Sequence, residues 1–146
     1  MQFQTACHHP NNQDNAVNKK DIIRQVFTDI IGSNHVDETA VRQLFAADYV
    51  QKVDGKTLDL DGLIAHLRAQ KQHIRHAQTE FITLIAEGDT VFSNHIVRAE
   101  KTDGKQVAVQ VLAQFNFDKQ GKILLCDELT RLIQGDETDK QLGSVR

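Results

Sequence analysis

The feature that most constrains the fold is a change of hydrophobic period near residue 79. Before it, apolar residues recur at three- and four-residue steps, which is the spacing of amphipathic helices. After it, apolar and polar residues alternate, which is the spacing of half-buried strands. The alternating segments cover residues 79–86, 90–101, 106–117 and 121–133, with a glycine in each turn between them. Because tight turns join antiparallel neighbours, the pattern predicts an antiparallel meander.

Three helices are expected to precede these strands. The first begins at Asn18, which can cap it, and ends at Gly32. The second begins near Asp37, and the third spans residues 61–74. Between the second and the third helix, residues 48–56 are expected to form a short extended segment that ends in an Asp-Gly turn. Helices followed by strands predict an α+β domain in which the helices pack on one face of the sheet.

The chain of 146 residues fits one domain, which we place at residues 18–134. Residues 1–17 are expected to be a disordered tail, and residues 135–146 a polar C-terminal tail that is either solvated or folded back through Leu142. The N-terminus is polar where a signal peptide needs an apolar segment, so a cytoplasmic location is expected.

Composition argues against several classes of partner. The net charge is −3, with 17 basic and 20 acidic residues spread along the chain, so nucleic acid is not expected to bind. No apolar run reaches 18 residues, so no membrane partner is expected either. The cluster Cys7-His8-His9 lacks the four ligands of a structural zinc site, and we expect no metal. Cys7 and Cys126 are expected to be free thiols. The histidines His66, His73 and His76 are expected to be solvated rather than metal ligands.

The last strand contains two adjacent carboxylates, Asp127 and Glu128. Successive side chains of a strand point to opposite faces, so only one of the two can face a core or pocket, and alternation alone does not choose between them. In the strand over residues 90–101, one face is small or apolar around a single imidazole and consists of Val91, Ser93, His95, Val97 and Ala99. The last strand has apolar residues on both faces, so both are expected to be covered, one of them by a second subunit.

Several short motifs, in this order, resemble the SnoaL-like branch of the nuclear transport factor 2-like superfamily. The features are the order of the three expected helices, the segment Asp48-Tyr49-Val50-Gln51, Glu87-Gly88-Asp89 before a strand, and Gly121-Lys122-Ile123 before the last strand. The resemblance covers roughly residues 18–134. It implies a curved antiparallel sheet wrapped around N-terminal helices, as a cone-shaped, cystatin-like α+β barrel with a pocket. It also implies a homodimer formed through the sheet. Relatives of this kind include polyketide cyclases, limonene-epoxide-hydrolase-like enzymes and ketosteroid isomerases.

The resemblance also implies which side chains form the site. An acidic residue five positions after the Ile of Gly-Lys-Ile faces the pocket in the cyclase and epoxide hydrolase branches, and that position is Glu128. His95 stands where the epoxide-hydrolase-like members have a pocket arginine, whereas Val97 replaces their second aspartate and Lys52 replaces a histidine common in SnoaL-like sequences. We therefore expect Glu128 and His95 as catalytic residues, with a substrate-binding wall of Tyr49, Ser93, Val97, Cys126 and Thr130.

Two functions follow from these expectations. One is cofactor-independent acid/base catalysis of isomerase, cyclase or hydrolase type on a small hydrophobic substrate. The other is a non-catalytic ligand-binding or dimeric scaffold protein with the same pocket. Both Glu128 and His95 also have structural interpretations, Glu128 as the partner of Arg98 or Arg131 and His95 as a hydrogen-bonded core residue.

Overall fold

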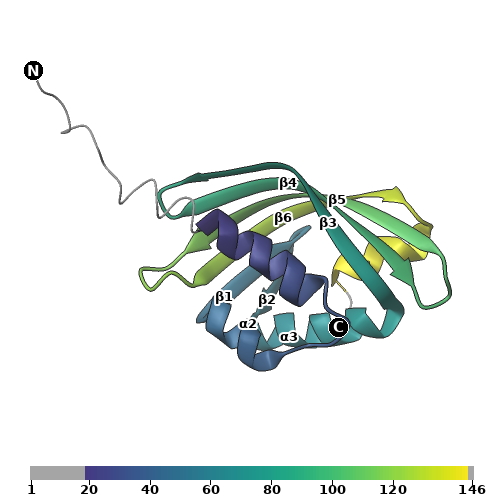
Figure 1. Cartoon of the computed structure of the whole chain (residues 1–146), viewed down its shortest axis with the longest axis horizontal. Coiled ribbons are helices and arrows are strands. Elements are labelled where there is room, and N and C mark those ends of the chain that lie inside the picture. Colours follow the sequence, from purple (N-terminus) through teal and green to yellow (C-terminus); the bar gives the residue numbers. More distant parts are fainter. Residues whose placement is uncertain (1–18, 145–146) are drawn as a thin grey trace, which may run out of the picture.

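A computed structural model describes residues 19–144, with side chains described through residue 140 (Figure 1). The residues expected to be a disordered N-terminal tail, including Cys7-His8-His9, lie outside this range. An α-helix over residues 19–25 continues into a π-helix. The remaining order is η2 (Val26–Ile31), α2 (Glu38–Leu44), β1 (Phe45–Val53), β2 (Lys56–Asp59), α3 (Leu60–His73), β3 (Ile74–Glu87), β4 (Thr90–Lys101), β5 (Gln106–Phe117), β6 (Ile123–Gln134) and the 3-10 helix η3 (Glu137–Ser144).

The six strands form one sheet in the order β2-β1-β6-β5-β4-β3. Strands β3 to β6 are the predicted antiparallel meander, and the α+β fold class is confirmed: the sheet curves over the helices, which lie on its concave side (Figure 1). One pair differs from the expected antiparallel pattern, since β1 runs parallel to β6. Parallel neighbours need a long connection, and here α3 and four strands lie between them in the chain. The result is a mixed sheet.

The N-terminal helix changes from α to π geometry in its second half. The N–H of Gly32 donates to the carbonyl oxygen of Phe27, five residues earlier, at 2.9 Å. This end of the helix is tight, because a Cβ on residue 32 would lie 2.7 Å from the carbonyl oxygen of Thr28. The helix buries Val26 and Ile30 and contacts β3. It thereby closes one side of the space beneath the sheet.

Side-chain alternation divides the meander into an inner and an outer face. On β4, Val91, Ser93 and His95 are at most 1% exposed, as the sequence pattern predicts for the inner face. On β5, alternate residues from Val107 to Phe117 are likewise mostly buried. The outer face keeps large apolar side chains in solvent, namely Ile82, Ile85, Phe92, Leu112, Leu129 and Ile133.

The segment after β6 packs against the domain as far as its side chains are described. Asp139 of η3 is 4% exposed and pairs with Lys101 of β4, with 2.8 Å between Nζ and Oδ1. Gly135 makes the bend possible: its φ is +140°, and a Cβ there would lie 2.6 Å from Oδ2 of Asp139. The side chain of Leu142 lies outside the described part of the chain.

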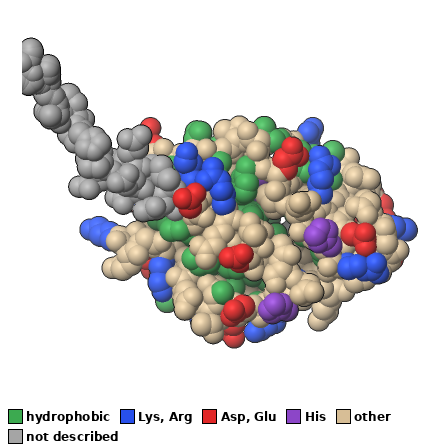
Figure 2. Space-filling model, viewed as in Figure 1, with side chains coloured by type: hydrophobic (Ala, Val, Ile, Leu, Met, Phe, Trp, Pro, Cys, Tyr) green, Lys and Arg blue, Asp and Glu red, His purple; other side chains and the backbone are tan. Residues whose placement is uncertain are grey.

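Surface charge is mixed on the face seen in Figure 2. Acidic and basic side chains are interspersed around a central group of hydrophobic side chains. Exposed ion pairs such as Arg42 with Asp61, at 2.9 Å, contribute little to stability. Across residues 19–144, no helix combines the length and apolar character needed to cross a membrane.

Candidate functional site

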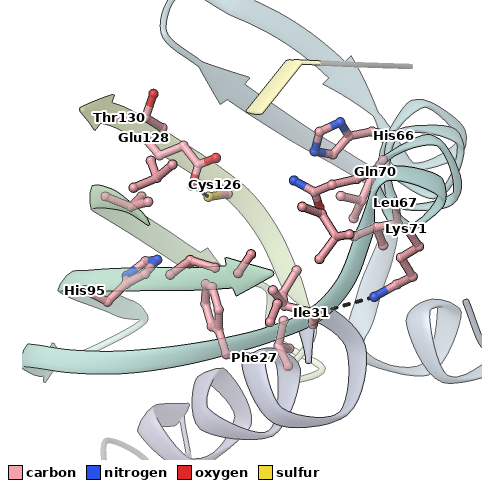
Figure 3. A pocket seen from close by; sticks show the side chains of 18 of the residues that line it. Phe27, Ile31, His66, Leu67, Gln70, Lys71, His95, Cys126, Glu128 and Thr130 are labelled. Carbon is pink, nitrogen blue, oxygen red and sulfur yellow. Dashed lines mark hydrogen bonds between the residues drawn. The ribbon is translucent and has the colours of Figure 1, made fainter. Parts of the chain in front are cut away.

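The concave face of the sheet, the N-terminal helix and α3 enclose a cavity of about 590 Å³. This volume is within the usual range for small-molecule sites. Six of the seven predicted site residues line it, namely Tyr49, His95, Val97, Cys126, Glu128 and Thr130, and Figure 3 shows four of them with the helical side chains opposite. Ser93, the seventh, is fully buried and hydrogen-bonded to His95. Much of the remaining lining is apolar and includes Val26, Phe27, Leu63, Leu67, Val109, Val111 and Leu132.

Glu128 is placed on the inner face of β6, with Ala113 of β5 and Val53 of β1 as its cross-strand neighbours. Burial raises the pKa of its carboxyl group to about 7, and the nearby negative charge of Asp54 adds to that rise. The thiol of Cys126 donates to Oε2 of Glu128 at 3.8 Å, and this hydrogen bond lowers the pKa of the carboxyl. Within residues 19–140, no ion pair includes Glu128, so the carboxyl lacks a cation that would favour ionisation.

A polar row runs beside Glu128 on β1 and β6. The hydroxyl of Tyr49 donates to Oε1 of Gln51 at 2.8 Å, and both residues are buried. Burial raises the pKa of the Tyr49 hydroxyl and of the Cys126 thiol well above their usual values. Cys126 is therefore a neutral thiol rather than a thiolate nucleophile. The sequence pattern missed Gln51, although it lies two residues from Tyr49 and hence on the same face of the strand.

His95 faces the cavity from β4 within an aromatic surround. Its ring centroid lies 4.5 Å from that of Phe27 and 5.5 Å from that of Phe81. Its Nδ1 is 2.8 Å from Oγ of Ser93, which fixes the ring orientation. Burial lowers the pKa of His95 to about 4. At neutral pH the ring is therefore an uncharged imidazole.

Glu128 and His95 line one cavity but are separated on the sheet. Glu128 is in register with Ala113, whereas His95 is in register with Val111, two residues away on the same strand. Their backbones are thus two strands apart, or about 10 Å, and offset by about 7 Å along the strands. No direct hydrogen bond joins the two side chains in the described structure. A ligand between them would contact each with a different part.

Asp54 is a site residue that the sequence pattern treated only as part of a turn. It lies at the rim of the cavity in the left-handed conformation, with φ of 49°. Its Oδ1 accepts a hydrogen bond from the N–H of Thr130 at 2.8 Å, and its Oδ2 accepts one from the Thr130 hydroxyl. The N–H of Asp54 in turn donates to the carbonyl oxygen of Glu128 at 3.0 Å. The sequence has no local signal for these contacts, which join residues 76 positions apart.

Helix α3 forms the wall opposite β6 (Figure 3). His66 and Gln70 point into the cavity from this helix, and His66 is only 5% exposed. The expectation that His66 is solvated is therefore wrong, because this position falls on the inward stripe of α3 next to Leu67. His73 and His76 are exposed, as expected.

Lys71 joins α3 to the end of the N-terminal helix. Its ammonium group donates to the carbonyl oxygens of Ile30 at 2.7 Å, Ile31 at 3.2 Å and Ser33 (Figure 3). These are carbonyls left without helical partners, which a lysine can satisfy. Burial lowers the pKa of Lys71.

Metal ligands are not grouped in the part of the chain that the structure describes. No set of three or more His, Cys, Asp or Glu side chains is arranged to hold an ion among residues 19–144. The polar groups of the sheet side of the cavity include the Glu128 carboxyl, the neutral thiol of Cys126, the neutral imidazole of His95, and the amide and phenol of β1. Such a set can donate and accept protons or hydrogen bonds without a cofactor.

Comparison with protein families matches residues 23–125 to the SnoaL-like domain. An uncharacterized protein of Schizosaccharomyces pombe is 33% identical over 124 residues, which cover 85% of this chain and 94% of that protein.

Solved structures with similar folds are much more distant in sequence. A SnoaL-like polyketide cyclase candidate from Jannaschia sp. CCS1 is 12% identical, with a TM-score of 0.68 over 100% of this chain and 99% of that one. An LEH-like epoxide hydrolase from M. tuberculosis is 14% identical, with a TM-score of 0.65 over 80% and 84% of the two chains. An NTF2-like protein of unknown function from Exiguobacterium sp. 255-15 is 16% identical, with a TM-score of 0.57 over 82% and 98%. At these identities the likeness establishes a shared fold.

Proposed function

The chain belongs to the SnoaL-like domain family, and on that premise we propose that it binds a small hydrophobic molecule and transfers a proton to or from it without a cofactor. The cavity would hold the apolar body of the ligand against residues such as Val97 and Val111. Glu128 would be the acid or base, and His95 a neutral hydrogen-bonding group. Isomerisation, cyclisation and hydrolysis are the reaction types that such a set can serve.

The observation that carries this proposal is the state of the Glu128 carboxyl. It lies in a largely apolar cavity, without an ion-pair partner among the described residues, and its pKa is raised to about 7. A structural carboxylate is usually paired or hydrogen-bonded to charged or N–H donors, which lower its pKa. A carboxyl that titrates near neutral pH can both give and take a proton under physiological conditions.

Two other side chains give this carboxyl a defined surrounding. The Cys126 thiol contacts its Oε2, and Tyr49 lies beside the thiol with its hydroxyl directed to Gln51. A ligand oxygen placed at Glu128 would therefore meet protonated, uncharged donors. Such donors stabilise negative charge that develops on an oxygen when a neighbouring proton is removed or a ring opens.

The test is turnover of a panel of hydrophobic epoxides, lactones and conjugated ketones by the purified protein, followed by mass spectrometry. Hydrolysis adds the mass of water, whereas isomerisation and cyclisation leave the mass unchanged and alter the retention time. Glu128→Gln keeps the size of the side chain and removes its titration. We expect it to reduce any turnover by about 10²-fold or more; unchanged turnover in this variant would remove Glu128 from the mechanism.

The alternative is a pocket that binds without catalysis. It is favoured by the distance between Glu128 and His95 on the sheet, which leaves them without a shared proton. In that case the Glu128→Gln variant would still bind the compounds that the wild-type protein binds, and neither protein would change them. Calorimetric titration with the same panel separates the two functions.

We also propose that two copies of the chain pair through the outer face of the sheet. This face exposes six large apolar side chains, among them Leu129 at 64% and Ile85 at 58%, and such patches commonly mark interfaces. It also carries both Glu80 and Arg98, so a second copy related by a two-fold axis offers complementary charge. Light scattering should give twice the mass of one chain for the wild-type protein and the mass of one chain for Leu129→Arg.

A cytoplasmic location completes the proposal. It is supported by the free thiol of Cys126, which the structure buries in the site rather than in a disulfide. Fractionation of cells that produce the tagged protein would test it, with recovery in the cytosolic fraction as the expected result.

A further inference from the structure

The turn between β1 and β2 is attached to the strand that carries Glu128. Three hydrogen bonds make the attachment: two from Thr130 to the carboxylate of Asp54, and one from the N–H of Asp54 to the carbonyl oxygen of Glu128. An aspartate in the left-handed conformation, with φ of 49°, places its carboxylate across the strand edge at the cavity rim. These contacts exceed what is needed to close a two-residue turn.

From this geometry we propose that Asp54 is a positioning residue for Glu128, holding β6 in place through Thr130 and acting on the Glu128 carboxyl through its own negative charge. The inference rests on the proposed role of Glu128. In this proposal Asp54 affects the reaction by positioning Glu128 and shifting its protonation, without contacting the ligand.

The chemical consequence is that Glu128 acts first as a proton donor. Asp54 is exposed and accepts two hydrogen bonds, so its negative charge is well solvated, whereas Glu128 is desolvated in the cavity. When two carboxyl groups are close, the less solvated one keeps its proton. With Asp54 in place, Glu128 of the free protein would therefore stay protonated to a higher pH than it would without that charge.

Besides Lys71, three cationic side chains line the same cavity and are bonded elsewhere: Arg131 donates to Oε1 of Gln110, Arg75 pairs with Glu100, and Lys140 pairs with Glu137. The inner faces of β1, β4 and β6 contribute Tyr49, His95 and Cys126, which are all uncharged at neutral pH. From α3, the ammonium of Lys71 is bound to three carbonyl oxygens at the end of the N-terminal helix, and His66 lies on the opposite wall. From η3, Asp139 is paired with Lys101.

The experiment is a carbon-13 NMR titration of the Glu128 carboxyl in the full chain without ligand, so it needs no substrate. Asp54→Asn removes the charge, keeps an oxygen acceptor for Thr130 and suits the left-handed conformation. We expect it to lower the pKa of Glu128 by about half a unit to one unit at low salt. Added salt should shrink the difference between variant and wild type, because Asp54 is exposed to screening.

Two matched variants separate charge from structure. Thr130→Val removes a hydrogen bond to Asp54 and keeps the charge, so the pKa of Glu128 should not fall. Asp127→Asn removes the neighbouring charge on the opposite face of β6, and its effect should be smaller than that of Asp54→Asn. The inference is overturned if Asp54→Asn leaves the titration of Glu128 unchanged, or if Thr130→Val lowers the pKa as much.

Failure of this inference and failure of the proposed function give different results. Absence of turnover, or turnover that survives Glu128→Gln, would reject the function and leave the coupling between the two carboxyl groups intact. An unchanged titration in Asp54→Asn would reject the coupling and leave Glu128 as the candidate acid.

Discussion

The two candidate catalytic side chains, His95 and Glu128, line the same cavity and have different surroundings. His95 is enclosed by Phe27 and Phe81 and held by Ser93. Glu128, in contrast, accepts a hydrogen bond from the Cys126 thiol and is near a second carboxylate, Asp54. Burial favours the uncharged form of both groups: it lowers the pKa of the imidazole to about 4 and raises that of the carboxyl to about 7.

The difference separates the two groups by how readily each can change its charge. A group fixed by a short hydrogen bond and two ring contacts is well suited to orient a ligand and poorly suited to change its own charge. A carboxyl with a weak partner and a pKa of about 7 changes charge readily at neutral pH. On the proposed function, proton transfer would take place at Glu128, and His95 would orient the ligand.

The largest test of this division compares Glu128→Gln with His95→Gln in the turnover assay. We expect a loss of about 10²-fold or more for the first and about 10-fold for the second, since removing a neutral hydrogen bond costs about 1 to 2 kcal/mol. Equal losses in the two variants would show that the two groups share the chemistry. Circular dichroism of both variants controls for folding.

The next largest effect is a pair of opposite dependences of stability on pH. Folded Glu128 keeps a proton between about pH 4.5 and 7 that the unfolded chain has lost, so its contribution to the free energy of unfolding falls as the pH rises through that window. For His95 the unfolded chain holds the extra proton between about pH 4 and 6.5, so its contribution falls as the pH drops. Each contribution is about 3 kcal/mol at most.

In the wild-type protein the two dependences oppose each other between about pH 4.5 and 6.5. Substituting either residue alone leaves the pH dependence of the other to be measured. In urea titrations, His95→Gln should become less stable from pH 4.5 to pH 8, and Glu128→Gln should become more stable from pH 4 to pH 7. If either slope has the opposite sign, the burial of that group has been assigned wrongly.

A smaller difference is expected when the partner of each group is removed. Ser93→Ala leaves Nδ1 of a buried ring without its bond and should lower the free energy of unfolding by about 1 to 3 kcal/mol. Cys126→Ala removes only a weak thiol donor and should cost less through that bond, while raising the pKa of Glu128 further because the thiol lowers it. Thermal unfolding and the carbon-13 titration measure the two effects.

Much of the fold and one half of the site follow from periodicity. The bounds predicted for residues 90–101 and 106–117 coincide with β4 and β5, because turns with glycine interrupt a clear alternation. The same alternation places Ser93, His95 and Val97 on one face. For Glu128, alternation offered two candidates, and the family resemblance favoured the one that the structure places inside the cavity.

The other half of the site depends on contacts between distant segments. Asp54 reaches the site because β1 pairs with β6 in parallel, a pairing that no local pattern in the sequence announces. His66 is different, because its position beside Leu67 on an amphipathic helix predicts burial. We expected it to be solvated because its side chain is polar. The π-helical hydrogen bond at Gly32 also lies outside what a 3.6-residue period can predict.

That π-helical segment makes the length of the N-terminal helix a determinant of the cavity wall. A π-turn holds one residue more than the corresponding α-turn, so the side chains before and after it face directions that a regular helix would not allow. Deleting one residue from Val26–Ile31 would restore an α-helical path and keep the preceding part of the helix close to its present orientation, because the π-turn accommodates the extra residue. The side chains of the segment itself would be rearranged, and with them the contact between Phe27 and the ring of His95. In evolutionary terms, insertion and deletion at this point would reshape this part of the cavity wall in a single step, whereas substitutions would alter it one side chain at a time.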